Sequence, residues 1–409
     1  MKPKARWQTF SAAPHRMLMF GGALQFVASI GYWLVELTGR YTAWWEPLQT
    51  SIPAVQAHAF LMIYGLFPFF IFGFLMTTYP RWMGTGEVRR SEYVRTFLLM
   101  ITGSVLFHLG LYTSAGVLLL GVAVFGLGFL NGAMALWRVY RTARGRERRY
   151  ERLLNIALGV GVLGIGLFAV GQATDRGELM VWSQGIGVWW FLAPVLATVS
   201  HRMLPFFTGC VPGTEPVGQP RFGLALLTGG VALHGLLELA GLWRWTWSVD
   251  LPVAAVAAYN LWNWGFARSF RARLLAMLHV SFAWLGLAFV LYGVRSLVWL
   301  FTGSDYLARA PLHALGIGFI AGMTFAMATR VTLGHSGRDL QADGLTWTLF
   351  WLLSVAAVLR VMGELPWSAM LGGIAATWLA AVVFAAAVLL WALRYGPIYL
   401  RPRADGRPG

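Results

Sequence analysis

The chain has little charge, few acidic residues and a single cysteine. Only 12% of its 409 residues are charged, whereas 58% are hydrophobic. Soluble globular domains usually contain about 25% charged residues, so this composition excludes an ordinary soluble domain. Cys210 stands alone, which excludes an internal disulfide framework and argues against a thiolate metal cluster. The composition is that of an integral membrane protein.

Several motifs of soluble enzymes are also missing. No P-loop, no HExxH zinc motif and no GxSxG nucleophile elbow lies at a suitable place. The glycines of GVGVLGIG follow no strand, so we interpret them as helix-packing residues rather than a phosphate loop. No convincing inverted repeat is present, which weakens the case for a secondary transporter.

Long apolar segments predict an all-α, polytopic bundle of transmembrane helices. A helix needs about 20 apolar residues to cross the hydrocarbon core of a bilayer. Segments of that length give about twelve crossings in one domain, residues 1–409, which ends in a short basic tail at 394–409. The crossings are expected near residues 15–37, 56–79, 95–112, 115–137, 153–173, 180–200, 222–243, 249–266, 273–295, 311–329, 345–362 and 370–393.

The net charge of +16 predicts topology rather than nucleic-acid binding. Arginines gather in alternate loops, for example at 81–95, 138–152 and 268–273, and again at 394–407. The positive-inside rule places such loops in the cytoplasm, and both termini with them. The run at 138–152 has a second interpretation, attraction of anionic membrane lipid or of a partner.

The segment at 309–338, RAPLHALGIGFIAGMTFAMATRVTLGHSGR, combines an apolar crossing with ionisable residues at both ends. His313 and His335 would lie on the order of 30 Å apart along a helix, so they cannot share one metal. Glycines after His313 remove side-chain bulk and would let a helix or a flat cofactor come close. Arg330 and Arg338 follow at the far end, as carboxylate partners or as topology charges. An ionisable side chain within a membrane indicates function by default.

The segment at 56–79 has a second buried histidine. His58 lies in its first turn, and Gly65 follows seven residues later, on the same face of an α-helix, where it would leave space beside the imidazole. Pro68 lacks a backbone N–H and is expected to bend the helix. His15, next to Arg16, is expected at the membrane interface.

The predicted topology sorts the remaining histidines by depth. A single buried histidine is explained at least as well by a hydrogen-bonded packing role, but several beside glycine-rich faces favour a cofactor. Neutral imidazole is a preferred ligand of haem iron and of copper. The outer half is expected to hold His58 and His313, with His108 and His234 as possible neighbours, and the inner half His201, His279 and His335.

The segment LHALGIGFIAGMTFAMATRVTLGHSGRDL resembles the C-terminal hallmark of the NnrS family. The resemblance extends to GFLMTTYPRWMG, RMLPFFT and LHVSFAW, and so covers nearly the whole chain in order. It implies a haem- and copper-associated protein of the bacterial inner (cytoplasmic) membrane, linked to nitric oxide metabolism and nitrosative stress. It also implies haem b, in one or two copies, possible copper, and a quinol or protein as electron donor.

The resemblance also assigns residues. His58 matches the first histidine of an HxHE-like motif, and His279, His313, Arg330, His335 and Arg338 match later positions. Where the family pattern has the second histidine and a glutamate, this chain has Phe60 and Leu61, which puts copper binding and proton delivery there in doubt. His201 replaces an expected small residue and is a candidate substitute ligand at the inner level.

These observations predict haem b between the segments at 56–79 and 311–329, ligated by His313, with His58 as the opposite ligand or a distal group. The inner histidines are candidates for a second haem or metal. The sequence identifies no catalytic residue. The cofactor-binding candidates are His58, His279, His313, Arg330 and Arg338, and the metal-ligand candidates are His58, His201, His279, His313 and His335.

Three functions follow from the pattern. The first is a haem-dependent protein, with oxidoreductase activity favoured, that binds or reduces nitric oxide or a similar diatomic. The second is a small-molecule permease without redox chemistry, which explains the helices but not the layered histidines. The third is a membrane electron-transfer subunit that needs a partner. The nitric oxide link rests on the resemblance alone.

Overall fold

The regular elements of this protein are helices throughout the part that the computed structural model describes, residues 3–143, 147–214, 218, 220, 222–365 and 373–407. The all-α prediction is thus confirmed for these ranges. Within them, ten helical segments are long and apolar enough to cross a membrane. They are α2 (Pro14–Tyr41), α3–η1–α4 (Ala54–Met83), α5 (Arg90–Thr113), α6 (Ala115–Thr142), α7 (Arg149–Ala173), α8–η2–α9 (Gly177–Gly209), α13 (Arg273–Thr302), α14–η4–α15 (Ala310–His335), α16 (Gly344–Met362) and α17 (Gly373–Tyr399).

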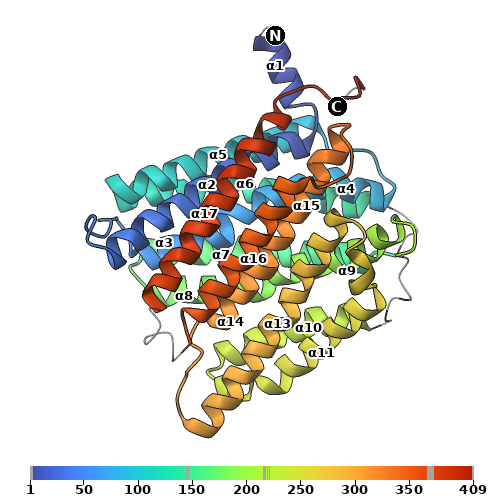
Figure 1. The fold of residues 1–409 in the computed structure, drawn as a ribbon. Helices are drawn as coiled ribbons and strands as arrows, with labels where there is room; N and C mark the ends of the chain where they lie inside the picture. Colours follow the sequence, from blue (N-terminus) through green and yellow to red (C-terminus); the bar gives the residue numbers. More distant parts are fainter. Residues whose placement is uncertain are drawn as a thin grey trace.

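The count of ten corrects the expected twelve. The predicted crossings at 222–243 and 249–266 correspond to α10 (Gly223–Leu239) and α11 (Trp247–Asn263), each of 17 residues. At 1.5 Å per residue such a helix is about 26 Å long, short of a bilayer core of about 30 Å. The apolar pattern continues past α10, but the chain turns away at Gly241, whose φ of 71° is left-handed. The short helices α10 and α11 pack beside α9 and α13 (Figure 1).

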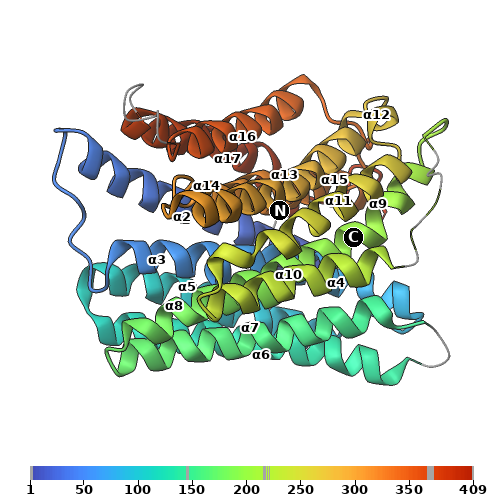
Figure 2. The ribbon, with the colours of Figure 1, turned by 90° about the horizontal axis from the view of Figure 1, so that it is seen from below.

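The bundle is layered. Figure 2 shows α16 and α17 on one face and α6 and α7 on the other, with α2, α3–α4 and α13–α15 between them. Three short helices complete the described part: α1 (Pro3–Phe10), η3 (Trp243–Trp245) and α12 (Phe266–Ser269). The middle layer therefore carries both segments between which the cofactor was expected.

Glycines let α5 and α6 approach closely. A Cβ atom added to Gly110 would lie 2.2 Å from the backbone nitrogen of Leu118, and one added to Gly121 would lie 2.5 Å from that of Phe107. In lipid, such small residues allow backbones to touch and give dispersion contacts that replace a hydrophobic driving force. Ser114 begins α6 by accepting a hydrogen bond from the Val117 N–H.

Three of the membrane-spanning segments contain π-helical stretches, namely η1 (Leu61–Leu66), η2 (Gly187–Leu192) and η4 (Ala314–Ala321). Pro68 and Pro194 lie in the first turn of the helices that follow η1 and η2. A proline ring clashes with the carbonyl four residues earlier, and a wider π-turn accommodates that clash. The bend expected at Pro68 therefore takes the form of a change in helix type.

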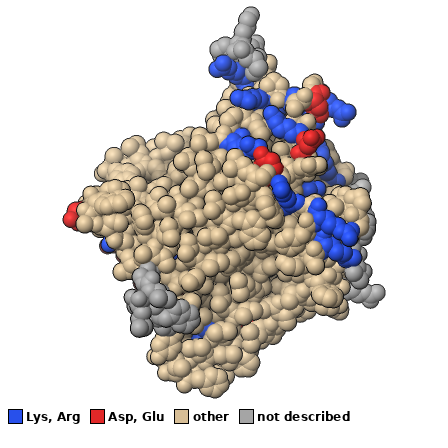
Figure 3. All heavy atoms as spheres, in the orientation of Figure 1, with Lys and Arg blue, Asp and Glu red and all other residues tan. Residues whose placement is uncertain are grey.

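Positive charge gathers at one end of the molecule. Lys and Arg cluster where both termini lie, whereas the visible remainder is nearly uncharged (Figures 1 and 3). We call this the basic end. By the positive-inside rule it is the predicted cytoplasmic end. Of the arginine-rich loops, positions 144–146 and 221 lie outside the described residues, as do positions 370–372 of the last predicted crossing. After α17, the described part of the tail runs from 400 to 407.

Candidate functional site

His58 and His313 both lie at the end opposite the basic end, in α3 and α14 (Figure 1). The two imidazoles interact electrostatically, and Arg360 of α16 acts on both. His58 lies in α3 and stacks on Trp33 of α2, with ring centroids 4.0 Å apart and planes 15° apart. The His58 Nδ1 atom is buried and has no hydrogen-bond partner among the described residues. We call His58 and His313 the outer pair.

A hydrogen bond fixes the tautomer of His313. Its Nδ1 lies 2.9 Å from the carbonyl oxygen of Arg309, four residues earlier. A carbonyl only accepts, so Nδ1 carries the hydrogen and Nε2 keeps its lone pair. Metal-ligating histidines usually hold their second ring nitrogen in this way. His313 is therefore prepared to offer Nε2 to a metal.

Open space lies at Gly316, within the π-helical stretch η4. A Cβ atom added there would have no neighbour within 4 Å, whereas one added to Gly318 would lie 2.3 Å from the ring of Trp284. Gly316 is three residues after His313, and both residues are partly exposed. Nearby, Arg360 donates to Glu364 at 2.5 Å through one amino group, and its other one, Nη1, is buried without a partner among the described residues.

The space expected at Gly65 is already filled. A Cβ atom added to Gly65 would lie 3.2 Å from Leu61 and 3.4 Å from Gln25. The π-helical stretch η1 begins three residues after His58 and includes Gly65, so a spacing of seven residues no longer places the two on one face of the helix. Gln25 also meets His108 at 3.2 Å, which gives that histidine a hydrogen-bonded packing role.

The basic end holds a histidine pair that sequence reasoning missed. The rings of His15, at the start of α2, and His335, at the end of α15, lie with centroids 4.7 Å apart. Arg403 donates to the His335 carbonyl at 3.1 Å, and Arg16 to the Tyr399 carbonyl at 3.2 Å. His15 is buried, not an interface residue. The sequence feature that could have pointed to His15 is the tetrapeptide HRML, which occurs at 15–18 and again at 201–204.

Arg338 lies beyond the end of α15, and its environment is unusual. Its Nη1 atom is buried and has no hydrogen-bond partner within the described ranges. The backbone N–H of Arg338 caps α15 by donating to the Leu333 carbonyl at 3.2 Å. An unpaired buried guanidinium nitrogen favours an anionic ligand.

The imidazole of His279 is fully buried, and one of its two ring nitrogens has a hydrogen-bond partner among the described residues. Its Nε2 lies 3.0 Å from the Thr208 hydroxyl, which already donates to the Leu204 carbonyl at 2.7 Å. Nε2 therefore donates to Thr208, and Nδ1 keeps a lone pair with no partner among the described residues. Arg330 of α15 lies 4.0 Å above the ring of Phe207, the residue before Thr208 in α9.

The inner histidines have separate partners. His201 lies 3.1 Å from the Tyr150 hydroxyl and 5.5 Å, ring to ring, from Trp264. His279 contacts Thr208, and His335 contacts His15. No group of three or more histidine, cysteine, aspartate or glutamate residues is arranged to hold a metal in the described part of the chain. The three inner histidines thus have different partners, whereas Arg360 acts electrostatically on both residues of the outer pair.

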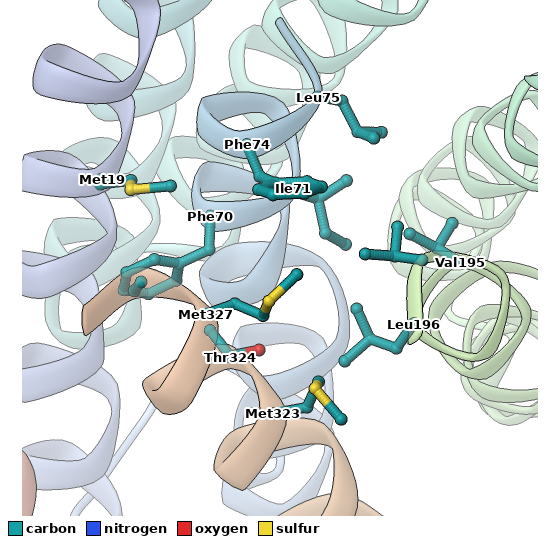
Figure 4. Close-up of a pocket in the computed structure, with 12 residues that line it drawn as sticks. Met19, Phe70, Ile71, Phe74, Leu75, Val195, Leu196, Met323, Thr324 and Met327 are labelled. Carbon is teal, nitrogen blue, oxygen red and sulfur yellow. The ribbon is translucent and has the colours of Figure 1, made fainter. Parts of the chain in front are cut away.

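An apolar hollow lies in the centre of the bundle. Its cavity volume is about 40 Å³, and every lining side chain is buried. Figure 4 shows Met19 of α2, Phe70 of α4, Leu196 of α9 and Met327 of α15 around it. Thr324 supplies its polar atom, and that hydroxyl donates to the Ile320 carbonyl. None of the predicted site residues lines this hollow.

The positions where this chain departs from the expected copper motif belong to the core. Phe60 is buried, stacks on Phe107 at 4.8 Å and meets Phe168 at 4.5 Å. Leu61 is buried as well. Neither side chain offers a ligand atom, so the residues present do not fit a copper site here.

A third ionisable cluster surrounds His234. No sequence pattern indicated the partners of this histidine, but the fold places Asp250 and Glu238 on its two ring nitrogens. The sequence feature that could have indicated this cluster is Asp250, an acidic residue within an apolar helix.

The family model described as NnrS protein matches residues 9–403 of the chain. The match spans the middle layer, the outer pair and the basic end, and it confirms the resemblance seen in the sequence. Among curated proteins, none matches.

Proposed function

The chain belongs to the NnrS family, and from that premise we propose that it is a haem-binding protein of the bacterial inner membrane that binds or reduces nitric oxide. The observation that carries the proposal is the outer pair. His58 and His313 come from different membrane segments, interact, and each have a ring nitrogen free to act as a ligand. Imidazole is a common axial ligand of haem iron.

The surroundings of the outer pair fit haem b. Gly316, three residues after His313, has no side chain and no neighbour within 4 Å of its Cβ position, which supports a flat group close to this part of the helix. Arg360 has a buried amino group without a partner among the described residues, and an arginine pairs well with a carboxylate such as a haem propionate. Trp33 holds the ring of His58 by stacking, and the Arg309 carbonyl holds that of His313.

The residues at this site have different roles. When bound, haem iron supplies the binding and redox chemistry of a diatomic gas. His313 anchors the group, because its tautomer is fixed by the Arg309 carbonyl. His58 would serve as a second ligand to the iron or as a distal group. We propose a quinol or a protein as electron donor for a reductive reaction, with Arg330, Arg338 and the inner histidines available to a second group.

The central hollow supports an apolar ligand. Nitric oxide is small and uncharged, and a lining of Met, Phe, Ile, Leu and Val residues offers it no competing hydrogen bonds. A polar solute would leave its groups unsatisfied there, at a cost of several kcal/mol. We therefore favour a gas-binding protein over a permease for polar molecules.

Optical spectroscopy of the purified protein tests this function. We expect the oxidised and reduced protein in detergent to show a Soret band that shifts on addition of nitric oxide, with iron but not copper in stoichiometric amount. A Soret band whose position does not change on addition of nitric oxide would instead identify a six-coordinate electron carrier. The absence of haem after haem-supplemented expression would overturn the proposal.

A further inference from the structure

The end opposite the basic end also contains a buried line of three ionisable groups. His234 of α10 lies between two carboxylates: its Nδ1 is 2.5 Å from Oδ1 of Asp250, and its Nε2 is 3.4 Å from Oε1 of Glu238. His234 and Asp250 are fully buried, whereas the Glu238 side chain is 16% exposed. One end of the line is therefore near solvent and the other is enclosed.

Close packing fixes the imidazole of His234 between aromatic rings. Its centroid lies 4.2 Å from Trp189 of η2 and 4.4 Å from Tyr292 of α13. A Cβ atom added to Gly235 would lie 2.4 Å from Trp189, so only glycine permits this approach. Held this way, the ring is hydrogen-bonded to Asp250 through Nδ1, while Nε2 lies 3.4 Å from Glu238 and has no hydrogen-bond partner among the described residues, so it is open to accept a proton.

Glu238 borders a polar hollow with a cavity volume of about 10 Å³, room for about one water molecule. The hollow lies between the end of α10, η3 and α13, at the end opposite the basic end. Glu238 also accepts a hydrogen bond of 2.8 Å from the Trp189 indole N–H. The other residues that line the hollow are Trp243, Thr246, Tyr292, Arg295, Ser296 and Trp299. Water in this hollow would reach Glu238 before it reached His234.

The charged groups around Glu238, His234 and Asp250 allow this line to take up one more proton. Arg295 is the cation that faces it, and Arg295 is already paired with Asp305 at 2.6 Å. Tyr292 faces the ring from α13, and Trp189 is the group that η2 contributes. Oδ2 of Asp250 is buried and has no hydrogen-bond partner among the described residues. A buried carboxylate with one unpaired oxygen gains a proton at low cost, and Oδ1, which faces Nδ1 of His234, is the atom that would receive it.

We propose that Glu238, His234 and Asp250 form a proton-loading site that takes a proton from the aqueous phase opposite the basic end and stores it on Asp250. Water first protonates Glu238. Glu238 then gives that proton to Nε2 of His234 while the Nδ1 hydrogen passes to Asp250. Glu238 ends deprotonated, the imidazole ends neutral as the other tautomer, and Asp250 has gained one proton. Histidine serves as a proton shuttle because its two nitrogens act in turn.

A purely structural ion pair is the competing explanation. It would hold α10 and α11 together without exchanging protons with the hollow. The two explanations differ in the behaviour of Asp250, because only the proton-loading site gives a carboxyl group that gains a proton and exchanges it through Glu238. Neither explanation depends on a haem.

Infrared spectroscopy of the full-length protein in detergent distinguishes the two. The carboxylic acid C=O band is followed during pH titration, and its shift is timed after transfer to deuterium oxide. We expect a titrating band that Asp250→Asn removes and that Glu238→Gln retains, with deuterium exchange slowed roughly tenfold or more. Asp175→Asn, which removes an exposed carboxylate in the loop after α7, should match the wild type.

Three results would overturn the proposal. They are the absence of a titrating carboxyl band in the wild type, its persistence in Asp250→Asn, and exchange in Glu238→Gln as fast as in the wild type. Should Asp250→Asn fail to fold, Glu238→Gln decides alone, because its side chain is partly exposed and its amide keeps the Trp189 hydrogen bond.

Discussion

At the scale of single residues, the position of one hydrogen decides what each histidine can do. His313 uses Nδ1 on the Arg309 carbonyl and keeps Nε2 available. His279 has the opposite arrangement, with Nε2 on Thr208 and a buried Nδ1 that has no described partner. In His234, Nδ1 is hydrogen-bonded to Asp250 and Nε2 lies 3.4 Å from Glu238, so this ring is placed to carry a proton between two carboxylates. Three chemistries thus follow from one residue type through its hydrogen-bond partners.

At the scale of helices, glycine determines which pairs pack most closely. Gly121 of α6 faces the α5 backbone, so Gly121→Ala would place a methyl group 2.5 Å from the Phe107 nitrogen. Overpacking of this kind costs about 1–3 kcal/mol. We expect a clearly lowered midpoint of thermal unfolding in detergent.

Gly159 of α7 provides the matched control. It lies within a helix, and an added Cβ atom would have no neighbour within 4 Å. Gly159→Ala should therefore leave the protein unchanged or stabilise it by up to about 1 kcal/mol through helix propensity. Equal loss of stability in both variants would contradict the role given to the α5–α6 contact.

The π-helical stretches are also element-scale features, and no sequence pattern predicted them. Apolar residues run continuously through η1, η2 and η4, so hydrophobic periodicity cannot separate π from α turns. Pro68 indicated that the helix is disturbed at this place, but it did not indicate a π-helical stretch. The expected space beside His58 at Gly65 is therefore absent, because a π-turn shifts every later side chain around the helix.

At the scale of the molecule, the single cysteine reports on topology. Cys210 follows α9 at the basic end and is exposed. If the basic end faces the cytoplasm, a membrane-impermeant maleimide should label Cys210 in inverted vesicles and leave it unlabelled in right-side-out vesicles. Labelling of Cys210 from the outer side would reverse the orientation.

A second variant completes this topology test. Asp175→Cys in a Cys210→Ser background places the thiol in the exposed loop after α7, at the other end of the bundle. It should react only in right-side-out vesicles. Labelling of both thiols from the same side would contradict the placement of these loops on opposite sides of the membrane.

The sequence predicted the membrane class and ten of the crossings. Those features depend on composition, segment length and residue type, which are local. The length of α10 depended on one backbone turn at Gly241. The partners of His15 and His234 depended on contacts between different helices, because only packing places His335 beside the first and Asp250 beside the second.

The central claim is that His313 holds haem, and the haem content of His313→Ala tests it most directly. The control is His108→Ala, a histidine of the same half of the membrane whose partner is Gln25. Both variants and the wild type are purified in parallel, and haem is quantified per polypeptide. We predict that His313→Ala loses most of its haem and that His108→Ala keeps a wild-type amount. Full haem occupancy in a folded His313→Ala protein would contradict the account.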